Sequence, residues 1–331
     1  MKTIRIAFTN YISQKKNVIA ELLSRVYNVE IVDFREKPDI IFFSLFGYDD
    51  HFKCRDAVRV YVTQENDVPN FNICDYGLSF HDIRFGDRSL RLPNYCYHNE
   101  AFNNLRSGKR LECERPERRS FCSVVISNNI FTSPERFEYW DRISEYKTVA
   151  SGGELGNNVG GRVADKFEFL SHYKFNLAFE NSLVDGYTTE KITDAFYAGT
   201  VPIYWGNRQV CNDFNPDAFI RINDFPSIDA AVDYIRQVDE DDELYLRYLR
   251  ANPLLGNPML DWEERLLEFL VPAVEGRRYL TQYGVSTDFN NLYLAARIRK
   301  FSNRILPNDK KWLQKTKEGI YKLLYRKVSD I

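Results

Sequence analysis

The alternation of short apolar runs with helically spaced apolar residues constrains the fold more than any other feature of this sequence. The runs at residues 4–8, 29–34, 39–46 and 58–63 are each typical of a strand, and residues 18–26 repeat apolar side chains at helical spacing. Because apolar residues dominate most of these runs, we expect a sheet that is covered on both faces. The segment TNYISQKKN follows the first strand, so this Rossmann-like unit lacks the G-x-G-x-x-G dinucleotide fingerprint.

A second α/β unit is expected after residues 99–119, which are polar and rich in charge. Strands are predicted at 121–127, 174–180 and 201–205, and helices from about Pro134, from about Thr189 and at 228–238. This order predicts parallel sheets with right-handed crossovers. We expect an α/β protein with two facing Rossmann-like domains, 1–118 and 119–296, with a ligand cleft between them. A tail, 297–331, follows.

Composition excludes several classes of protein. The net charge of −2 argues against a basic nucleic-acid binder. No apolar stretch approaches the roughly 18 residues of a membrane span, and the first residues are typical of a strand, not of a signal peptide. The six cysteines form no C-x-x-C pair, so we interpret them as reduced thiols of a cytoplasmic protein, with disulfides as the alternative. The four histidines have no metal-ligand spacing.

The segment FENSLVDGYTTEKITDAFYAGTVPIYWG, residues 179–206, points to a binding site. It predicts a strand, a loop and a helix that begins at Thr188 or Thr189, so Glu190 and Lys191 fall in the first helical turn. Ligands of open α/β proteins bind at this end of the strands, and helix N-termini favour phosphate. Lys191 suits a phosphate, while Glu190 suits ribose hydroxyls or a cationic sugar ring. The alternative is a helix-capping acid beside a solvated lysine.

These residues carry a resemblance to a known family. The segment closely resembles the donor-binding signature of the α-1,3-fucosyltransferases, glycosyltransferase family ten. Further similar segments lie at 61–80 and 121–143, so the resemblance covers roughly residues 57–256 in order. The animal members have an N-terminal membrane span and disulfides near the C-terminus, and this sequence shows neither. It therefore resembles the bacterial, cytoplasmic branch. The matching positions are Glu180, Asn181, Tyr187, Glu190, Lys191, Ala195, Gly199 and 202–206.

The resemblance implies a GT-B fold and an inverting transfer of fucose from GDP-fucose. The implied acceptor is a GlcNAc or Glc hydroxyl of a β-galactosyl disaccharide, of the N-acetyllactosamine type, as in Lewis antigens. The linkage, α-1,3 or α-1,4, stays open. Two alternatives remain: a non-catalytic protein that binds GDP-sugars or glycans, and a transferase for another nucleotide sugar.

Each chemical role has a candidate residue. Glu65 matches the family's general base, with Asp67 as the substitute and a loop carboxylate in water as the alternative. Arg136 resembles the phosphate-binding arginine, in a helix that we expect Ser133 to cap and Pro134 to begin. Together with Lys191 it would neutralise the diphosphate.

The other donor-binding candidates are less sharply marked. Asn181 and Tyr187 resemble residues that hold the nucleotide sugar. Glu180 either contacts the donor or is a structural carboxylate at the strand end. Gly153 belongs to a glycine-rich stretch, 151–161, which would let the nucleotide approach the backbone or would simply be a mobile loop.

No metal site is predicted. The Asp239-Glu240-Asp241 run fits a metal-binding Asp-x-Asp pattern, but we interpret it as a solvated charge cluster at a helix end. The resemblance implies that no metal is required, while leaving room for stimulation by a divalent cation.

The tail is distinctly basic. Residues 297–331 contain 11 Lys and Arg against three acids, a net charge of +8, with apolar residues on one helical face. Such a helix is typical of a membrane-surface anchor, which would place the protein at the inner face of the membrane by contact with anionic lipid. The alternative is a helix packed on the body of the protein.

Overall fold

The computed structural model of the chain describes residues 1–9, 18–45, 50–63, 65–97, 100–112, 115–127 and 133–279, with residues 294 and 297. These residues form two compact units. The first contains Met1–Val62, Asn70–Gly77 and the described residues from Pro272 onward; the second contains Thr63–Pro69 and Leu78–Val271. The expected boundary at residue 118 thus lies inside the second unit. The predicted basic tail lies outside the described residues, apart from Arg297.

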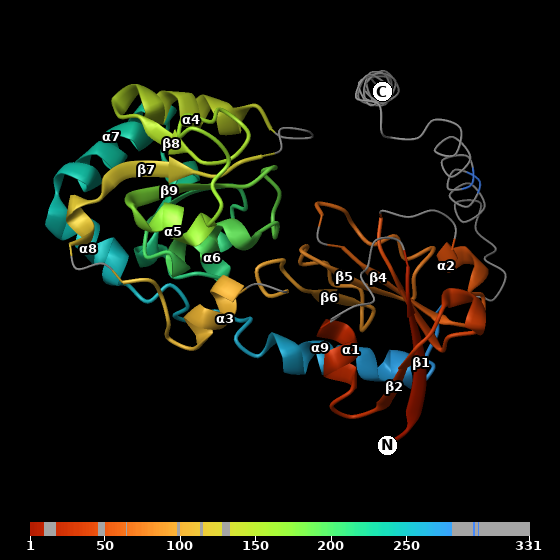
Figure 1. Cartoon of the computed structure of the whole chain (residues 1–331). Coiled ribbons are helices and arrows are strands. Elements are labelled where there is room, and N and C mark those ends of the chain that lie inside the picture. Colours follow the sequence, from red (N-terminus) through yellow and green to blue (C-terminus); the bar gives the residue numbers. More distant parts are fainter. Residues whose placement is uncertain are drawn as a thin grey trace. The chain divides into compact units, whose positions relative to one another are not determined.

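The amino-terminal sheet has the strand order β2-β1-β3-β4-β5-β6 (Figure 1). The first four strands pair in parallel, and Ile6 of β1 lies opposite both Ile31 and Ile40. Every residue of β3 and β4 is buried, as their apolar runs predict. The four expected strands are confirmed, whereas β5 and β6 were not expected. The elements are β1 Thr3–Phe8, α1 Val18–Leu23, β2 Asn28–Ile31, η1 Phe34–Glu36, β3 Ile40–Phe43, α2 Asp50–Lys53, β4 Val58–Val62, β5 Tyr76–Ser79 and β6 Ser89–Arg91.

The second sheet has the order β11-β10-β9-β7-β8, and all its pairings are parallel. Figure 1 shows α4 and α7 on one face of this sheet and α5 and α6 on the other. The strands expected at 121–127, 174–180 and 201–205 are confirmed, and so is the helix expected at 228–238. The elements are β7 Ser120–Val124, α4 Glu135–Tyr146, β8 Val149–Ser151, α5 Lys166–Ser171, β9 Tyr173–Phe179, α6 Glu190–Tyr197, β10 Val201–Trp205, β11 Ile220–Arg221, α7 Ile228–Glu240, α8 Asp242–Arg250 and α9 Trp262–Val274.

The second sheet contains a topological switch point. From β7 the chain moves to β8 on one side, and then returns to β9 on the other side of β7. In parallel α/β sheets, the loops at such a point diverge and leave a crevice at the carboxyl ends of the strands. The segments that follow β7 and β9 are therefore where a ligand is expected.

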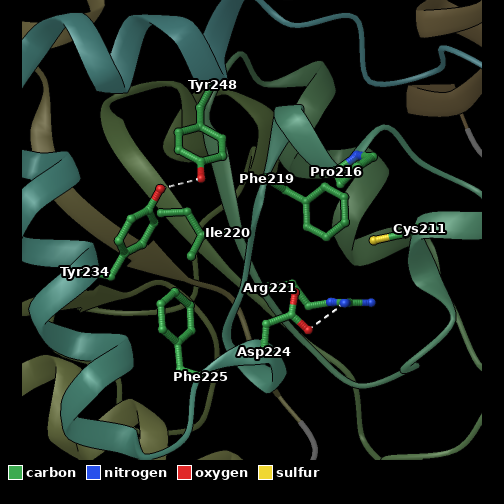
Figure 2. A pocket seen from close by; sticks show the side chains of 9 residues that line it. All are labelled: Cys211, Pro216, Phe219, Ile220, Arg221, Asp224, Phe225, Tyr234 and Tyr248. Carbon is green, nitrogen blue, oxygen red and sulfur yellow. Dashed lines mark hydrogen bonds and ion pairs between the residues drawn. The ribbon is translucent and has the colours of Figure 1, made fainter.

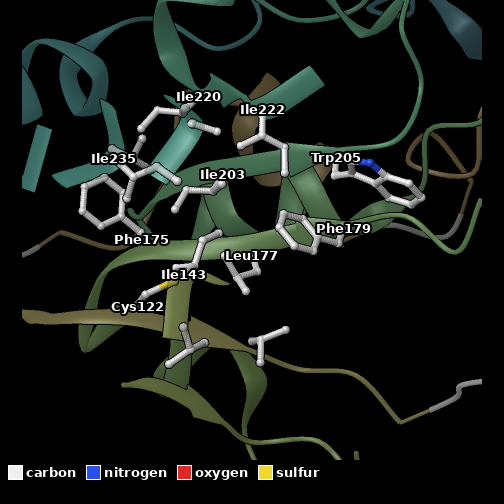
Figure 3. Close-up of a cluster of buried hydrophobic side chains, with 14 of the residues drawn as sticks. Cys122, Ile143, Phe175, Leu177, Phe179, Ile203, Trp205, Ile220, Ile222 and Ile235 are labelled. Atoms are coloured by element: carbon white, nitrogen blue, oxygen red, sulfur yellow. The ribbon is translucent and has the colours of Figure 1, made fainter. Parts of the chain in front are cut away.

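A hydrophobic cluster makes this sheet a rigid base for those loops (Figure 3). Phe175 and Phe179 of β9 and Ile203 of β10 have no solvent exposure, and Ile143 of α4 packs into the same cluster. Each such side chain contributes about 1.5–3 kcal/mol when it is fully buried. The loops that leave the carboxyl ends of these strands are therefore anchored to a rigid sheet.

The polar segment at 99–119 is packed onto the second unit. It contains α3 Glu100–Arg106 and a 3-10 turn, η2 Pro116–Arg118. Helix α3 contacts α6, the Leu111 amide donates to the Tyr197 carbonyl oxygen at 2.8 Å, and the Arg119 guanidinium donates to Gly199 O. These contacts explain why a segment with the composition of a linker belongs to a compact unit.

Two sequence expectations can be compared with the described part of the chain. There the five cysteines at 54, 74, 96, 122 and 211 are all free of disulfides. None of its helices is both long enough and apolar enough to cross a bilayer.

Candidate functional site

The predicted site residues gather at the carboxyl ends of β7 and β9, within the second unit. Helix α4 follows β7 and carries Arg136, while α6 follows β9 and carries Lys191. Glu65 belongs to the same unit, since its loop, Thr63–Pro69, packs there. Neither helix is capped as expected: Pro134 occupies the N-cap position of α4, and Thr189, the N-cap residue of α6, makes no side-chain cap.

Glu180 is fully buried and holds the start of α6. Its Oε1 accepts a hydrogen bond from the Thr189 amide at 2.7 Å, and its Oε2 accepts from the Thr189 hydroxyl at 2.7 Å and from Lys191 Nζ at 3.3 Å. Burial raises the pKa of this carboxyl, and Lys191 opposes the shift. Because both oxygens are occupied and no surface is exposed, the geometry favours the structural alternative for Glu180.

The ammonium group of Lys191 is surrounded by hydrogen-bond acceptors. Its Nζ donates to Thr189 Oγ1 at 2.8 Å and lies 3.8 Å from Glu190 Oε1. Burial acts to lower the pKa of this ammonium, but the carboxylates of Glu190 and Glu180 outweigh burial and raise it. The side chain is 18% exposed, so a charged ammonium is fixed in place and still reaches solvent.

Glu190 begins α6 and is the more accessible carboxylate of the pair. Its side chain is 40% exposed, and Asn94 Nδ2 lies 3.5 Å from its Oε2. Partial burial acts to raise the pKa of the carboxyl, but Lys191 and Lys166 outweigh it and the pKa lies below its usual value. Glu190 is thus a charged carboxylate that remains available to a ligand.

Arg136 is a buried cation without a carboxylate partner in the described residues. Only 1% of it is exposed, and Nη1 donates to Asn181 Oδ1 at 2.9 Å. Its Nε is buried and has no hydrogen-bond partner in the same part of the chain. Burial lowers the pKa of this guanidinium to about 10, and Glu180 opposes the shift. Since a buried charge is costly without a counter-charge, this side chain is suited to pairing with an anion.

Glu65 is an exposed residue whose backbone is held by the Thr63 side chain. The Thr63 hydroxyl donates to the Glu65 carbonyl oxygen at 3.1 Å and accepts from the Glu65 amide at 3.0 Å. Partial loss of water raises the pKa of the Glu65 carboxyl; Glu190 adds to the shift and Lys191 opposes it. The carboxyl is therefore close enough to the first turn of α6 to feel both charges, and it is a better proton acceptor than an ordinary glutamate.

Tyr187 is a buried residue that interacts with several members of this group. It is 3% exposed, and its ring packs edge-on against Phe80 with 4.9 Å between centroids. Burial raises the pKa of its hydroxyl, and Glu180, Lys191 and Glu65 also act on it. Hydrogen bonds and electrostatic interactions thus link Glu65, Arg136, Glu180, Asn181, Tyr187, Glu190 and Lys191, although their chemical roles stay predictions.

Gly153 has a packing reason to be glycine. A Cβ at this position would lie 2.0 Å from the Ile126 carbonyl oxygen, just beyond β7, so no other residue fits without a backbone shift. The loop is also held internally: Asn157 Nδ2 donates to Gly153 O at 2.7 Å and to Gly161 O at 2.9 Å. These hydrogen bonds hold the glycine-rich stretch in a defined conformation, whereas its role in nucleotide binding and the mobile-loop alternative both stay predictions.

The interpretation of the Asp239 run as a solvated cluster is wrong for Asp239, whereas Glu240 and Asp241 are exposed as expected. Asp239 is 8% exposed and lies 2.5 Å from Lys147 Nζ and 3.0 Å from Lys174 Nζ, because α7 ends beside these two lysines. Asp241 caps α8 by accepting from the Leu244 amide at 2.9 Å. Within the described ranges, no group of three or more His, Cys, Asp or Glu side chains could hold a metal ion.

A pocket of about 170 Å³ lies elsewhere in the second unit (Figure 2). The Tyr234 and Tyr248 hydroxyls meet across it at 2.8 Å, and Arg221 pairs with Asp224 at 2.5 Å. Its volume is below the roughly 300 Å³ of typical ligand pockets. It is distinct from the predicted site, because no predicted residue belongs to its lining, which consists of Cys211, Pro216, Phe219, Ile220, Arg221, Asp224, Phe225, Tyr234 and Tyr248.

Several residues that shape the site were missed by sequence reasoning. Arg91 forms two bonds to the buried carboxylate of Asp213, at 2.8 and 2.6 Å, and its Nε donates to Phe80 O at 3.0 Å. Asn94 approaches Glu190, and Asn207 binds the loop that carries Tyr187. No local motif marks these residues, since each contacts a partner distant in the sequence.

Two family models match most of the chain. A model for "Glycosyltransferase family 10 (fucosyltransferase) C-term" matches residues 115–268, and one for "Alpha-(1,3)-fucosyltransferase FucT N-terminal domain" matches residues 5–98. Both parts of the chain are thus similar to parts of the same kind of protein.

Similar proteins and structures agree with these matches. The alpha-(1,3)-fucosyltransferase FucT of Helicobacter pylori is 35% identical over 273 residues, which are 72% of this chain and 57% of the relative. A mouse 4-galactosyl-N-acetylglucosaminide 3-alpha-L-fucosyltransferase 9 is 35% identical over 141 residues, 41% of this chain and 38% of the relative. The chain therefore spans little more than half the length of the bacterial relative.

Solved structures cover more of the chain. A crystal structure of an α1,3-fucosyltransferase has a TM-score of 0.73 and 31% identity, and the match covers 85% of this chain and 92% of that one. A structure of such an enzyme with GDP-fucose has a TM-score of 0.72 and 30% identity, with 85% and 93% covered. The expected fold class, an α/β protein of the GT-B kind with two parallel sheets, is confirmed; the cleft between facing domains stays a prediction.

Proposed function

Since the chain belongs to glycosyltransferase family 10, we propose that it transfers fucose from GDP-fucose to a sugar hydroxyl. The supporting observation is the grouping of Arg136, Tyr187, Glu190, Lys191 and Glu65 in one unit, at the carboxyl ends of parallel strands. The similar structure with GDP-fucose supports the choice of donor.

The diphosphate is the part of the donor that this group suits best. Lys191 offers a fixed ammonium in the first turn of α6, where backbone N–H groups also favour anions. Arg136 offers a buried guanidinium that lacks a counter-charge in the described residues. Two cations at two helix starts would stabilise the charge that develops on departing GDP, so the reaction would need no metal.

The transfer would proceed with inversion. The acceptor oxygen forms a bond to C1 of fucose while the bond between C1 and the β-phosphate oxygen breaks, and GDP leaves. Glu65 takes the proton of the attacking hydroxyl, a role supported by its raised pKa. Glu190, which is charged and partly exposed, would stabilise positive charge on the sugar ring.

The proposed acceptor is an N-acetyllactosamine-type disaccharide, with fucose added to GlcNAc or Glc as in Lewis antigens. Support comes from the mouse relative, whose name describes fucosylation of 4-galactosyl-N-acetylglucosaminide. For the basic tail we propose attachment to anionic lipid at the cytoplasmic face of the membrane, on the evidence of its net charge of +8.

A panel assay tests the proposal. The protein is incubated with GDP-fucose and type 1 and type 2 disaccharides, and products are identified by mass spectrometry with linkage analysis. A mass increase of one fucose on a disaccharide is expected. Binding of GDP without transfer to any acceptor would favour a non-catalytic protein that binds GDP-sugars or glycans. Transfer from a different nucleotide sugar, and not from GDP-fucose, would favour a transferase for that sugar.

A further inference from the structure

The loop between β9 and α6 is held by groups that do not face a ligand. This donor loop, 181–189, carries Asn181 and Tyr187 and leads directly into Glu190 and Lys191. Glu180 fixes its last residue, Thr189. Its middle is fixed by Asn207, which follows β10 and is completely buried.

Asn207 uses both ends of its side-chain amide. Oδ1 accepts from the Gly186 amide at 2.8 Å and from the Gln209 amide at 2.9 Å, and Nδ2 donates to Thr188 Oγ1 at 2.9 Å. The backbone amide of Asn207 donates to the Tyr204 hydroxyl at 3.2 Å. One side chain thereby ties the residues on either side of Tyr187 to the end of β10.

The observed form of the loop requires a glycine at position 186. Its φ is +88°, and a Cβ would lie 2.7 Å from the Phe80 carbonyl oxygen, so a larger residue would not fit. Its carbonyl oxygen accepts from Arg91 Nη2 at 3.4 Å, while its amide is held by Asn207. The Tyr187 ring then packs on Phe80, and its direction is set by the anchored residues beside it.

We propose that Asn207 is a positioning residue for donor binding, holding the donor loop in the form that presents Tyr187 and the first turn of α6. This inference rests on the proposed donor site. Asn207 has no exposed surface, so its effect on the donor must act through Gly186 and Thr188. Loss of the side-chain amide leaves the Gly186 N–H without its acceptor and removes one donor from the Thr188 hydroxyl, so the loop would have to move to satisfy the Gly186 N–H.

The first test uses Asn207→Ala and the pair Thr188→Val and Thr188→Ser. Thr188→Val removes the hydroxyl that accepts from Asn207 at nearly constant volume, and Thr188→Ser keeps it. We expect Asn207→Ala and Thr188→Val to raise the KM for GDP-fucose and the Kd for GDP about tenfold, the effect of one good hydrogen bond. The acceptor KM should change less than twofold, and Thr188→Ser should stay near wild type.

Asn215→Ala is the matched control. Asn215 also braces a loop of this unit, since Nδ2 donates to Asn252 O at 3.0 Å and Oδ1 accepts from the Asp217 amide at 3.1 Å, but it does not contact the donor loop. Asn215→Ala should lower the midpoint of unfolding and leave the KM for GDP-fucose unchanged. A merely structural role for Asn207 would give this same pattern.

The outcomes separate the two proposals. All variants are measured at a temperature where circular dichroism shows them folded. If Asn207→Ala does not fold, the comparison of Thr188→Val with Thr188→Ser decides whether the positioning role holds. Unchanged donor affinity in Thr188→Val, or equal weakening of donor and acceptor, would overturn the positioning role. If Lys191→Met weakens GDP binding in the same assay, the donor site stands in either case; if it does not, the donor site itself is wrong.

Discussion

Lys191→Met should destabilise the protein as well as weaken donor binding. The variant keeps the length of the side chain but removes the ammonium that lies 3.3 Å from Glu180 Oε2. Glu180 has no solvent exposure, so its carboxylate would keep only the two hydrogen bonds from Thr189. A buried charge would then lack its counter-charge.

The size of the effect follows from the geometry. Breaking a buried ion pair by removing one partner costs about 3–5 kcal/mol. Lys191 is partly exposed and its separation from Glu180 is at the long end for a hydrogen bond, so we expect the low end, about 3 kcal/mol. Without Lys191, which opposes the shift, the pKa of Glu180 rises further above its unfolded value. The folded state then binds more protons than the unfolded state, so the deficit is largest at neutral pH and shrinks as the pH falls.

Urea unfolding of four proteins measures this: wild type, Lys191→Met, Glu180→Gln and the double variant. Gln in place of Glu180 leaves no buried charge, so the double variant should be more stable than Lys191→Met alone. The reasoning fails if Lys191→Met unfolds within 0.5 kcal/mol of wild type (about the limit for surface substitutions). It fails equally if the double variant shows no recovery.

Four further predictions concern activity and membrane binding. Glu65→Gln should abolish transfer and leave GDP affinity within about twofold. In the wild type, kcat/KM should fall on the acid side as the raised pKa of Glu65 is crossed, and Glu190→Gln should move that fall to lower pH because Glu190 adds to the shift. A fall in GDP affinity as large as the fall in rate would place Glu65 in the wrong site. Arg136→Ala should weaken GDP-fucose binding by about tenfold to hundredfold, as expected for a charged hydrogen bond to phosphate, and calorimetry that gives an unchanged Kd would contradict its assignment. Activity should persist in excess chelator; a complete loss that manganese restores would reveal a metal requirement. Deletion of residues 307–331 should leave transfer to disaccharides intact and abolish sedimentation with anionic vesicles at low salt, whereas unfolding of the truncated protein would support the packed-helix alternative.

Local sequence patterns predicted the central elements of the fold but not its edges. Strands β3, β4, β9 and β10 are buried over almost their whole length and consist mostly of apolar residues, and such runs are distinctive. Strands β6, β8 and β11 have only two or three residues each, and their pairing depends on neighbours distant in the chain. The polar segment at 99–119 lies at the junction of the two family matches, as its composition suggests, but no local pattern shows its contacts with α6, which place it in the second compact unit.

Sequence motifs predicted which residues form the site better than they predicted what each residue does there. The segment at 179–206 and the resemblance pointed to Arg136, Asn181, Tyr187 and Lys191, which the structure brings together. Asn207 was missed because an asparagine after a glycine is typical of any turn. Asp239 was misread because nothing in an acidic run shows that two distant lysines approach one of its members.

Strand alternation accounts for the different roles of the neighbours Glu180 and Asn181. Successive side chains at the end of β9 point to opposite faces of the sheet. Asn181 shares a face with Leu177 and Phe179, which pack with Ile143 of α4, and it meets Arg136 of that helix. Glu180 faces the other side, where α6 packs, and holds Thr189 and Lys191. One strand end therefore sets the positions of both cations, so a change in the end of β9 should disturb Arg136 and Lys191 together.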